Sequence, residues 1–374
     1  VLFDQADGTL QVFNHGNNIP RIEYDATGAV KGLLIEEART NNLKSSGDLN
    51  GSGWVAAATI GTVTAGSPFG TYQTLSPAYN STGIGPAQRY QIGRAITSGA
   101  TYVAWSLVKY SAGSGWFIVN LYDTTSGNKR AYFDVQNGVV GVKDATLLDH
   151  GMVDYGDGWW LCWVSANAAS TSGGVSCEAP NGDNVLSCSA ADVILIAGTQ
   201  FEQGAFPTSY IPTTGATATR ATDVAIIPRS SFGHHNEAST WVFEFTPTFP
   251  SVDTNQVLLQ RYGSGYDFYI WSTYSGTLSS SYMNSAASPY FPITANQTSK
   301  IAVVLKHGEY LSACVDGGSI SQNSVLSDTT VHTPTVVGWA DVDYVLGGDQ
   351  LGHIKSIKYY PRSLTNTQLQ ELTT

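Results

Sequence analysis

The chain has 374 residues, which exceeds one ordinary hydrophobic core and predicts at least two domains. Its net charge of −11 and pI near 4.9 argue against nucleic acid as a partner, because phosphate binding needs a basic face. Only 13% of residues are charged while 11% are aromatic, which with 39 glycines favours β-sandwiches over helical folds. No apolar run reaches about 18 residues, so we expect no membrane insertion.

Residues 1–44 are predicted to form an extended N-terminal arm. They are polar and carry a turn signal at Asp25–Gly28 between two extended pieces. The first eight residues lack the basic start and long apolar stretch of a signal peptide.

Residues 45–222 are predicted to form a first β-sandwich. Short strand-like runs at 101–110, 114–124, 129–142, 156–166 and 191–202 alternate with turns rich in Gly, Ser and Asn. In the second run, alternation places Trp116, Ile118 and Asn120 on one face, and an apolar set that includes Phe117 and Val119 on the core side. Strands at this spacing are typical of a sandwich or jelly roll.

The segment 200–224 is predicted to be an extended strap that closes this domain. Pro207 and Pro212 fix φ and bias the residues before them towards extended geometry. Phe206, Tyr210 and Ile211 give the strap apolar surface to bury.

Residues 223–374 are predicted to form a second antiparallel sandwich that ends in a short helix. Asp316–Gly317 is a hairpin signal in this part of the chain. Thr365 fits a helix N-cap, and Gln368 completes a capping box. The whole chain is therefore expected to be all-β, with two jelly-roll sandwiches, an N-terminal extended arm and a C-terminal helix.

Four cysteines are few for this length. Cys177 and Cys188 flank a turn-rich loop, and they could form either a hairpin-closing disulfide or a pair of free thiols. Cys162 and Cys314 lie in strand-like runs and are expected to be small buried apolar residues. No Cys/His spacing resembles a zinc site.

Two segments carry a family resemblance. The run PRIEYDATGAVKGLLIEEARTN at 20–41 and the run QFEQGAFPTSYIPTTGATATRATDV at 200–224 resemble a module of tailed-phage virion proteins such as tail fibres, tail-tip proteins and head spikes. In such proteins the two motifs bracket a jelly roll similar to carbohydrate-binding modules. The closing run LGHIKSIKYYPRSLTNTQLQELT resembles the end of a laminin G or concanavalin A-like sandwich.

No pattern of catalytic residues is apparent. Glycosidases on a concanavalin A-like scaffold need paired carboxylates on one strand face, and the chain has no Glu-x-Asp-x-x-Glu run. A lyase needs Tyr, His and Arg together, and nothing in the sequence joins His307, Tyr310 and Arg261. We therefore expect a protein that is not an enzyme.

Alternation in the run 266–274 suggests a carbohydrate-binding stripe. If Tyr266, Phe268 and Ile270 face the core, the residues between them form an aromatic surface beside a carboxylate, which suits the apolar faces and hydroxyls of sugars. The alternative is that these aromatic residues cover the core or a subunit interface. The candidate carbohydrate-binding residues are Asp267, Tyr269, Trp271, Tyr282, Tyr290 and Trp339.

No cofactor is expected, although calcium is a weaker alternative. Asp341, Asp343 and Asp349 flank a Gly-Gly loop, and loop carboxylates of this kind either bind Ca²⁺ or are solvated.

The resemblance implies a virion surface protein, a fibre or spike that mediates adsorption by binding a host cell-surface glycan. It also implies a homo-oligomer, expected to be a trimer, and contacts of the 1–44 arm with other virion proteins. A purely structural decoration protein and a polysaccharide depolymerase or lyase on the same scaffold are the alternatives.

Overall fold

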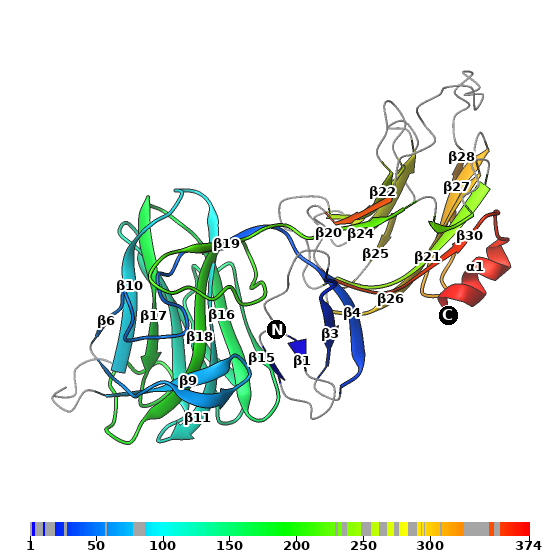
Figure 1. Cartoon of the computed structure of the whole chain (residues 1–374). Coiled ribbons are helices and arrows are strands. Elements are labelled where there is room, and N and C mark those ends of the chain that lie inside the picture. The colour runs from blue at the N-terminus through cyan, green and yellow to red at the C-terminus, as the bar shows by residue number, and fades with distance from the viewer. Residues whose placement is uncertain are drawn as a thin grey trace. The chain divides into compact units, whose positions relative to one another are not determined.

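The computed structural model describes residues 2–3, 10–11, 19–25, 28–56, 58–77, 87–228, 231–233, 238–247, 256–261, 268–272, 277–282, 290–292, 294, 296–306, 309–324, 344–347 and 352–374. From 256 to 292 and at 344–347 the description covers the backbone alone. These residues confirm the expected all-β class, with antiparallel sheets and a short C-terminal helix (Figure 1). The chain divides into two compact units. The described part holds no helix long and apolar enough to cross a bilayer.

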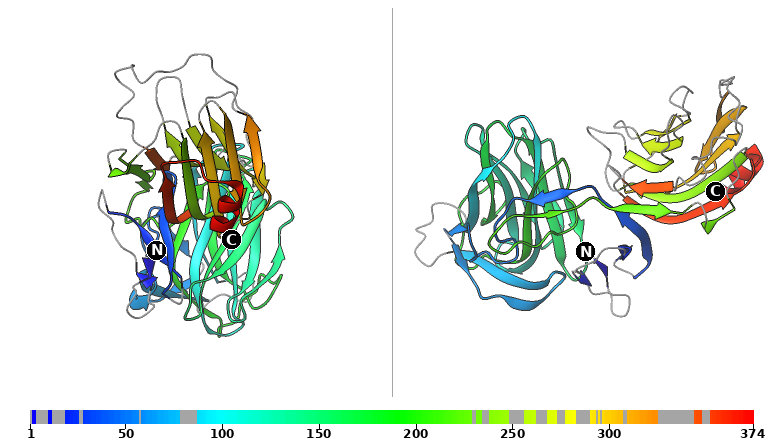
Figure 2. Two further views of the ribbon diagram at one scale, coloured as in Figure 1. Left: turned by 90° about the vertical axis from the view of Figure 1, so that its right-hand side faces the viewer. Right: turned by 45° about the horizontal axis from the view of Figure 1, so that its top comes forward.

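The first unit is a sandwich of two sheets, visible in Figures 1 and 2. Its six-stranded sheet has the order β14 (Val139–Lys143), β13 (Gly127–Asp134), β12 (Trp116–Asp123), β17 (Ser172–Ala179), β10 (Ala87–Ala95) and β6 (Val55–Ala56). Its seven-stranded sheet has the order β15 (Asp149–Asp154), β16 (Trp159–Asn167), β11 (Thr101–Ala112), β18 (Val193–Gln203), β9 (Gly70–Pro77) and β7 (Ala58–Ile60), with β8 (Thr64–Ser67) paired to β9.

The core of this unit lies between the two sheets and follows the strand alternation. Phe117, Val119 and Leu121 of β12 all belong to it, as expected. Gly174 of β17 marks a close approach of backbones, because a Cβ there would lie 1.9 Å from the carbonyl oxygen of Gln91. Strand β10 carries an irregularity between Gln91 and Arg94 at this point, so only glycine fits opposite it.

The predicted strap is confirmed, and it packs on the seven-stranded sheet. Phe206 and Ile211 are buried, and the ring of Tyr210 stacks on Phe69 with centroids 4.4 Å apart. Tyr210 also meets Trp105 of β11 edge to face at 5.8 Å. The two prolines favour an extended backbone in this segment.

Strap and arm are also joined by hydrogen bonds. The side-chain amide of Asn41 donates to the carbonyl of Ile211, and its oxygen accepts from the backbone of Phe201 and Leu43. Next to Asn41, β5 (Arg39–Asn41) pairs with β19 (Ala218–Arg220). The two segments that carry the family resemblance therefore meet in space although about 160 residues separate Asn41 from Phe201.

The second unit contains two further sheets. Its six-stranded sheet has the order β20 (Val224–Ile227), β29 (Tyr344–Gly347), β22 (Gln256–Arg261), β23 (Phe268–Ser272), β24 (Thr277–Tyr282) and β25 (Tyr290–Pro292). Its seven-stranded sheet has the order β28 (Ser321–Ser324), β27 (Tyr310–Val315), β26 (Ser299–Lys306), β21 (Ala238–Pro247), β30 (Gly352–Tyr360), β4 (Val30–Ile35) and β3 (Ile22–Tyr24). A separate two-stranded sheet joins β1 (Leu2–Phe3) to β2 (Leu10–Gln11).

Alternating residues of β21 serve two apolar clusters. Trp241, Phe243 and Phe245 belong to one cluster, while Val242 packs with Leu364 and Leu369 in the cluster that includes the C-terminal helix. That helix is α1 (Asn366–Thr373), and its Thr365 N-cap and Gln368 form the predicted capping box. Asp316 and Gly317 both adopt positive φ between β27 and β28, as the hairpin signal predicted.

The division into units differs from the expected boundaries of 44/45 and 222/223. Residues 39–220 belong to the first unit, whereas 30–38 and 221–374 belong to the second. Strand β4, expected within the arm, pairs antiparallel with β30, and His353 lies opposite Leu34. Gly32 of β4 is required there because a Cβ would lie 2.6 Å from the carbonyl oxygen of Ile354. The jelly roll is thus inserted in the sequence of the second sandwich, and an anchoring role for the arm stays a prediction.

Ionic contacts hold Arg21, Glu23 and Glu36 of the arm within the second unit. Arg21 binds Glu36 with a distance of 2.8 Å between Nη1 and Oε2, and its other amino group contacts the carboxylate of Asp223. The backbone N–H of Glu36 donates to Asp223 as well. On β3, the Glu23 carboxylate lies 2.5 Å from His353 Nε2. Burial opposes the ionisation of Glu23, but its contacts with His353 and Lys31 prevail and hold its pKa well below the usual range.

The disulfide between Cys177 and Cys188 is not formed, which corrects one of the two readings of this pair. Cys177 is a buried thiol on the core side of β17, and its sulfur lies 3.3 Å from the Ser106 hydroxyl and 3.4 Å from that of Thr199. Strand alternation turns this side chain into the core, and Cys188, in the loop after β17, packs against the same core as a reduced thiol. Burial raises the pKa of the Cys177 thiol to about 11, which makes it unreactive.

Candidate functional site

The face of the six-stranded sheet opposite the core gathers polar and aromatic residues, and we call it the outer face. The strand register determines which residues lie on the outer face, because residues paired across antiparallel strands share a face. The residues that form it are Arg130 and Tyr132 of β13, Trp116, Ile118, Asn120 and Tyr122 of β12, Ser176 and Glu178 of β17, and Gln88 and Tyr90 of β10. None of them belongs to the core cluster between the sheets.

A chain of hydrogen bonds runs across the outer face. Asn120 Nδ2 donates to Asn128 Oδ1 at 2.8 Å and to Ser176 Oγ at 2.9 Å. The Ser176 hydroxyl in turn donates to Glu178 Oε1 at 2.6 Å. Asn120, Ser176 and Glu178 are all buried, so their geometry is fixed by the sheet and not by solvent.

The electrostatics of this chain centre on Glu178. Burial raises its pKa, while hydrogen bonds from Ser176 and Asn120 and the charge of Arg130 offset that effect in part. Burial also raises the pKa of Tyr132, and the neighbouring Arg130 opposes this rise. The charge of Arg130 therefore lowers the pKa of both Glu178 and Tyr132. The Arg130 side chain is half-buried on the outer face.

Three aromatic side chains are half-buried on the outer face: Trp116, Tyr122 and Tyr90. The ring of Trp116 packs against Gly141 of β14, where a Cβ would lie 2.5 Å from the ring. Half-buried rings are suited to the apolar C–H faces of sugars, whereas Ile118, Asn120, Tyr132, Ser176 and Glu178 are buried beneath the surface and support the rings. The outer face is therefore the best candidate for a binding surface in the described part of the chain.

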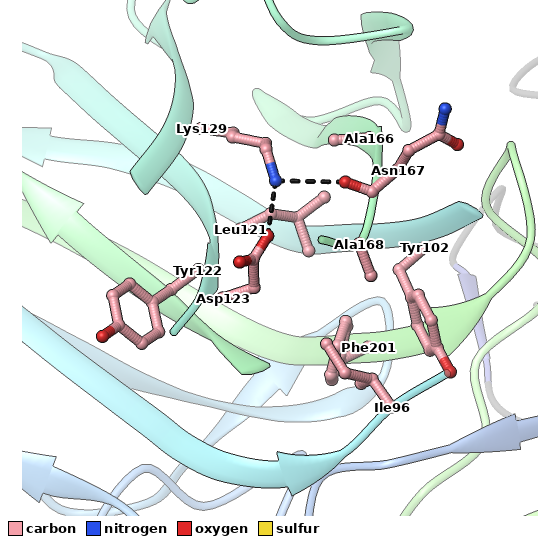
Figure 3. A pocket seen from close by; sticks show the side chains of 10 residues that line it. All are labelled: Ile96, Tyr102, Leu121, Tyr122, Asp123, Lys129, Ala166, Asn167, Ala168 and Phe201. Carbon is pink, nitrogen blue, oxygen red and sulfur yellow. Dashed lines mark hydrogen bonds and ion pairs between the residues drawn. The ribbon is translucent and has the colours of Figure 1, made fainter. Parts of the chain in front are cut away.

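A pocket at one end of the same sandwich has a different character (Figure 3). Lys129 Nζ lies 2.6 Å from Asp123 Oδ2 and donates to the carbonyl of Asn167 at 3.0 Å. Asp123 also accepts from the backbone N–H groups of Thr125 and Ser126, which closes the turn between β12 and β13. Burial opposes its ionisation, yet Lys129 and Ser126 hold its pKa well below the ordinary range.

The size of this pocket excludes a sugar. Its volume is about 20 Å³, which is room for a single water molecule, whereas ligand pockets measure roughly 300–1,000 Å³. Tyr102, Leu121 and Phe201 form its apolar wall (Figure 3). Since both ionic groups already have partners, we interpret the pocket as structural.

The carbohydrate-binding residues expected in the second sandwich are only partly described. Asp267 and Trp339 lie outside the described residues, and the side chains of Tyr269, Trp271, Tyr282 and Tyr290 do too. The backbone register pairs position 271 with 279 and 279 with 290, while it pairs 282 with 268. Positions 271 and 290 therefore share one face of the sheet, and position 282 belongs with Phe268 on the other. The stripe remains a prediction, without Tyr282.

The calcium hypothesis stays a prediction as well. Asp341, Asp343 and Asp349 all lie outside the described residues. The described part of the chain contains no group of three or more His, Cys, Asp or Glu side chains arranged to hold a metal ion.

Sequence reasoning identified one strand of the outer face but not the site. Alternation had placed Trp116, Ile118 and Asn120 away from the core, which the structure confirms. It did not indicate that Arg130 and Glu178 join them, because that depends on the pairing of β12 with β13 and with β17. The charged residues within the two strands, Arg130 of β13 and Glu178 of β17, were the available signal.

No protein-family model and no curated protein sequence matches the chain. Among solved structures, domains LG4-5 of the mouse laminin α1 chain align with 85% of this chain and 92% of their own, at 11% identity and a TM-score of 0.25. The tandem CBM22 domains of Xyn10C from Paenibacillus barcinonensis align with 87% of this chain and 98% of theirs, at 12% identity and a TM-score of 0.26. TM-scores this low carry no argument about function.

Proposed function

We propose that the protein binds glycans through the outer face of its jelly roll and acts as a surface fibre or spike of a tailed-phage particle. One observation carries the binding proposal: the buried chain Asn120–Ser176–Glu178 lies among the half-buried rings of Trp116 and Tyr122. Buried polar groups that are fully paired hold their neighbours in one geometry. A surface of rings held in one geometry binds a sugar without losing much conformational entropy.

The phage assignment has a separate support. It depends on the resemblance of segments 20–41 and 200–224, whose residues Asn41 and Ile211 are in contact. That contact agrees with a module defined by both motifs together. Host adsorption, the virion surface as location and contacts of the arm with other virion proteins all rest on this resemblance.

The binding proposal is tested with a glycan array and titration calorimetry on the full chain. Trp116→Ala and Tyr122→Ala should each weaken binding about five- to thirtyfold, because ring–sugar contacts are each worth roughly 1–2 kcal/mol. Tyr72→Ala is the matched control, since Tyr72 is half-buried on the seven-stranded sheet and packs on Trp159. Unchanged affinity in both outer-face variants would exclude this face as the site, and an array without any bound glycan would favour a structural decoration protein.

A polysaccharide depolymerase is the second candidate, and Glu178 is the reason to keep it. A buried carboxyl group with a raised pKa is the form that a general acid takes in glycoside hydrolysis. We nevertheless propose a binding protein that is not an enzyme, because the Glu178 carboxylate is buried and already accepts from Ser176. Release of oligosaccharides from purified host capsule by the wild type, lost in Glu178→Gln, would reverse this choice.

A further inference from the structure

The outer face extends across most of the six-stranded sheet, beyond the rings on β12. Tyr90 of β10 pairs with Val55 of β6 on one side and with Ser176 of β17 on the other. Ser176 pairs in turn with Asn120, and Asn120 pairs with Arg130. Because paired residues share a face, these five residues form one row across five neighbouring strands (Figure 1). Neighbouring strands lie about 4.8 Å apart, which makes the row about 19 Å long.

An apolar group lies at the β6 end of this row. Val55 is 48% exposed, and so is Ile92, which lies two residues after Tyr90 on β10. Gln91, between Tyr90 and Ile92, is buried and pairs with the core residue Val175, so alternation turns Ile92 to the outer face. Tyr90 itself is half-buried. We call Val55, Tyr90 and Ile92 the β10 group.

The β10 group and the rings described above lie on strands that are not neighbours. Trp116 and Tyr122 belong to β12, and β17 separates this strand from β10. On the outer face β17 contributes Ser176 and Glu178, which are both buried. Two strand intervals measure about 10 Å. A ligand that contacts both sets of side chains must therefore be longer than a single sugar ring.

The chemistry of the β10 group indicates an uncharged ligand with apolar faces. None of its three members is charged. Arg89, on the same strand, alternates to the opposite side with Cys177 and donates to Asn50 Oδ1 at 2.9 Å. A tyrosine ring offers an apolar face beside a hydroxyl group, which matches the surface of a sugar. The edge strand β6 has only two residues, which disfavours the addition of a strand from a protein partner.

We propose that the outer face binds at least three consecutive sugar residues of one linear glycan, which crosses the strands from β12 to β10. One sugar lies over Trp116 and Tyr122, a second passes over β17, and an uncharged third lies on the β10 group. This inference rests on the proposed glycan binding by the same face. It specifies the ligand as the interior of a chain and excludes a single terminal sugar. The continuity of the β10 group with the proposed site, through the row of paired residues, carries it.

A series of ligand lengths tests the inference on the full chain. The probes are fragments of one, two and four sugar residues prepared from the strongest glycan on the array. Ligand-observed nuclear magnetic resonance measures the weak affinities, and calorimetry measures the strong ones. Affinity should rise at least tenfold from one sugar residue to four, because only the longest fragment reaches both sets of side chains. Equal affinity for all three fragments overturns the inference.

Substitutions in the β10 group provide the second test. Tyr90→Ala should weaken binding of the four-residue fragment about five- to thirtyfold and change that of the single sugar less than about twofold. Val55→Asp should also weaken the four-residue fragment, because it places a charge beside an uncharged sugar. Val55 is exposed, so this variant should keep the urea midpoint of the wild type. Val63→Asp is the matched control, since Val63 is 51% exposed and lies outside the outer face.

The outcomes separate this inference from the proposed function. Wild-type affinity for the four-residue fragment in both Tyr90→Ala and Val55→Asp overturns the inference. If binding is independent of fragment length but still requires Trp116, the inference fails and glycan binding by the outer face stands. If no fragment and no array glycan binds, both fail together.

Discussion

The buried pair of Asp123 and Lys129 should stabilise the jelly roll asymmetrically. Asp123→Asn removes the counter-charge of the buried Lys129 ammonium, which is 8% exposed, and uncompensated burial of one member of an ion pair costs about 3–5 kcal/mol. Lys129→Met leaves the Asp123 carboxylate with backbone donors from Thr125, Ser126 and Ala169, so it should cost less, about 1–3 kcal/mol. The double variant should recover part of the loss, with a coupling free energy of at least about 1.5 kcal/mol.

Native-state hydrogen exchange of peptides from the β12–β13 hairpin measures these free energies in the full chain. Since the folded pKa of Asp123 is lowered, the pair stabilises above the unfolded pKa of about 3.9 and loses this contribution as pH falls towards the folded pKa. The gap between wild type and Asp123→Asn should therefore be constant from about pH 5 to 8 and shrink below about pH 4. Equal and additive losses in the two single variants would refute this reasoning.

Three further predictions concern other parts of the fold. Because the pKa of Glu178 is raised in the folded state, the stability of the wild type falls as pH rises above the unfolded pKa of about 4.3. Differential scanning calorimetry should therefore show a melting temperature for Glu178→Gln that equals or exceeds that of the wild type at pH 7. This advantage should be lost at pH 4. Gly174→Ala should yield little soluble protein because its Cβ meets the Gln91 carbonyl, whereas Gly127→Ala, with open space around it, should cost about 1 kcal/mol by urea unfolding. Arg21→Met leaves the carboxylates of Glu36 and Asp223 close together, and limited proteolysis should then cut within residues 19–38 faster than in the wild type.

Local patterns in the sequence predicted local structure well. The alternation in β12, the prolines of the strap and the capping box at Thr365 each depend on residues close in the chain, and the structure confirms all three. The same reasoning placed residues 30–35 in an arm, since nothing in their own sequence indicates that β30, more than 300 residues later, is their partner.

The pairing of strands distant in sequence also determines which side chains meet at the candidate site, and the sequence alone did not indicate that pairing. Cys177 and Cys188 are close in sequence and both contact the core of the first sandwich, yet both are reduced thiols. Glu178, one residue after Cys177, faces the opposite side and reaches Ser176 and Asn120. A strand is read from its own residues, whereas a site on a sheet requires the register of three strands at once.

Glycan binding by the outer face is tested most directly by hydrogen exchange of the full chain with and without the strongest ligand from the array. Amides of β12, β13 and β17 at the level of Asn120 should exchange more slowly when the ligand is bound, and Trp116→Ala should remove that protection. Protection confined to the second sandwich, with these strands unchanged, would contradict the account and place binding elsewhere.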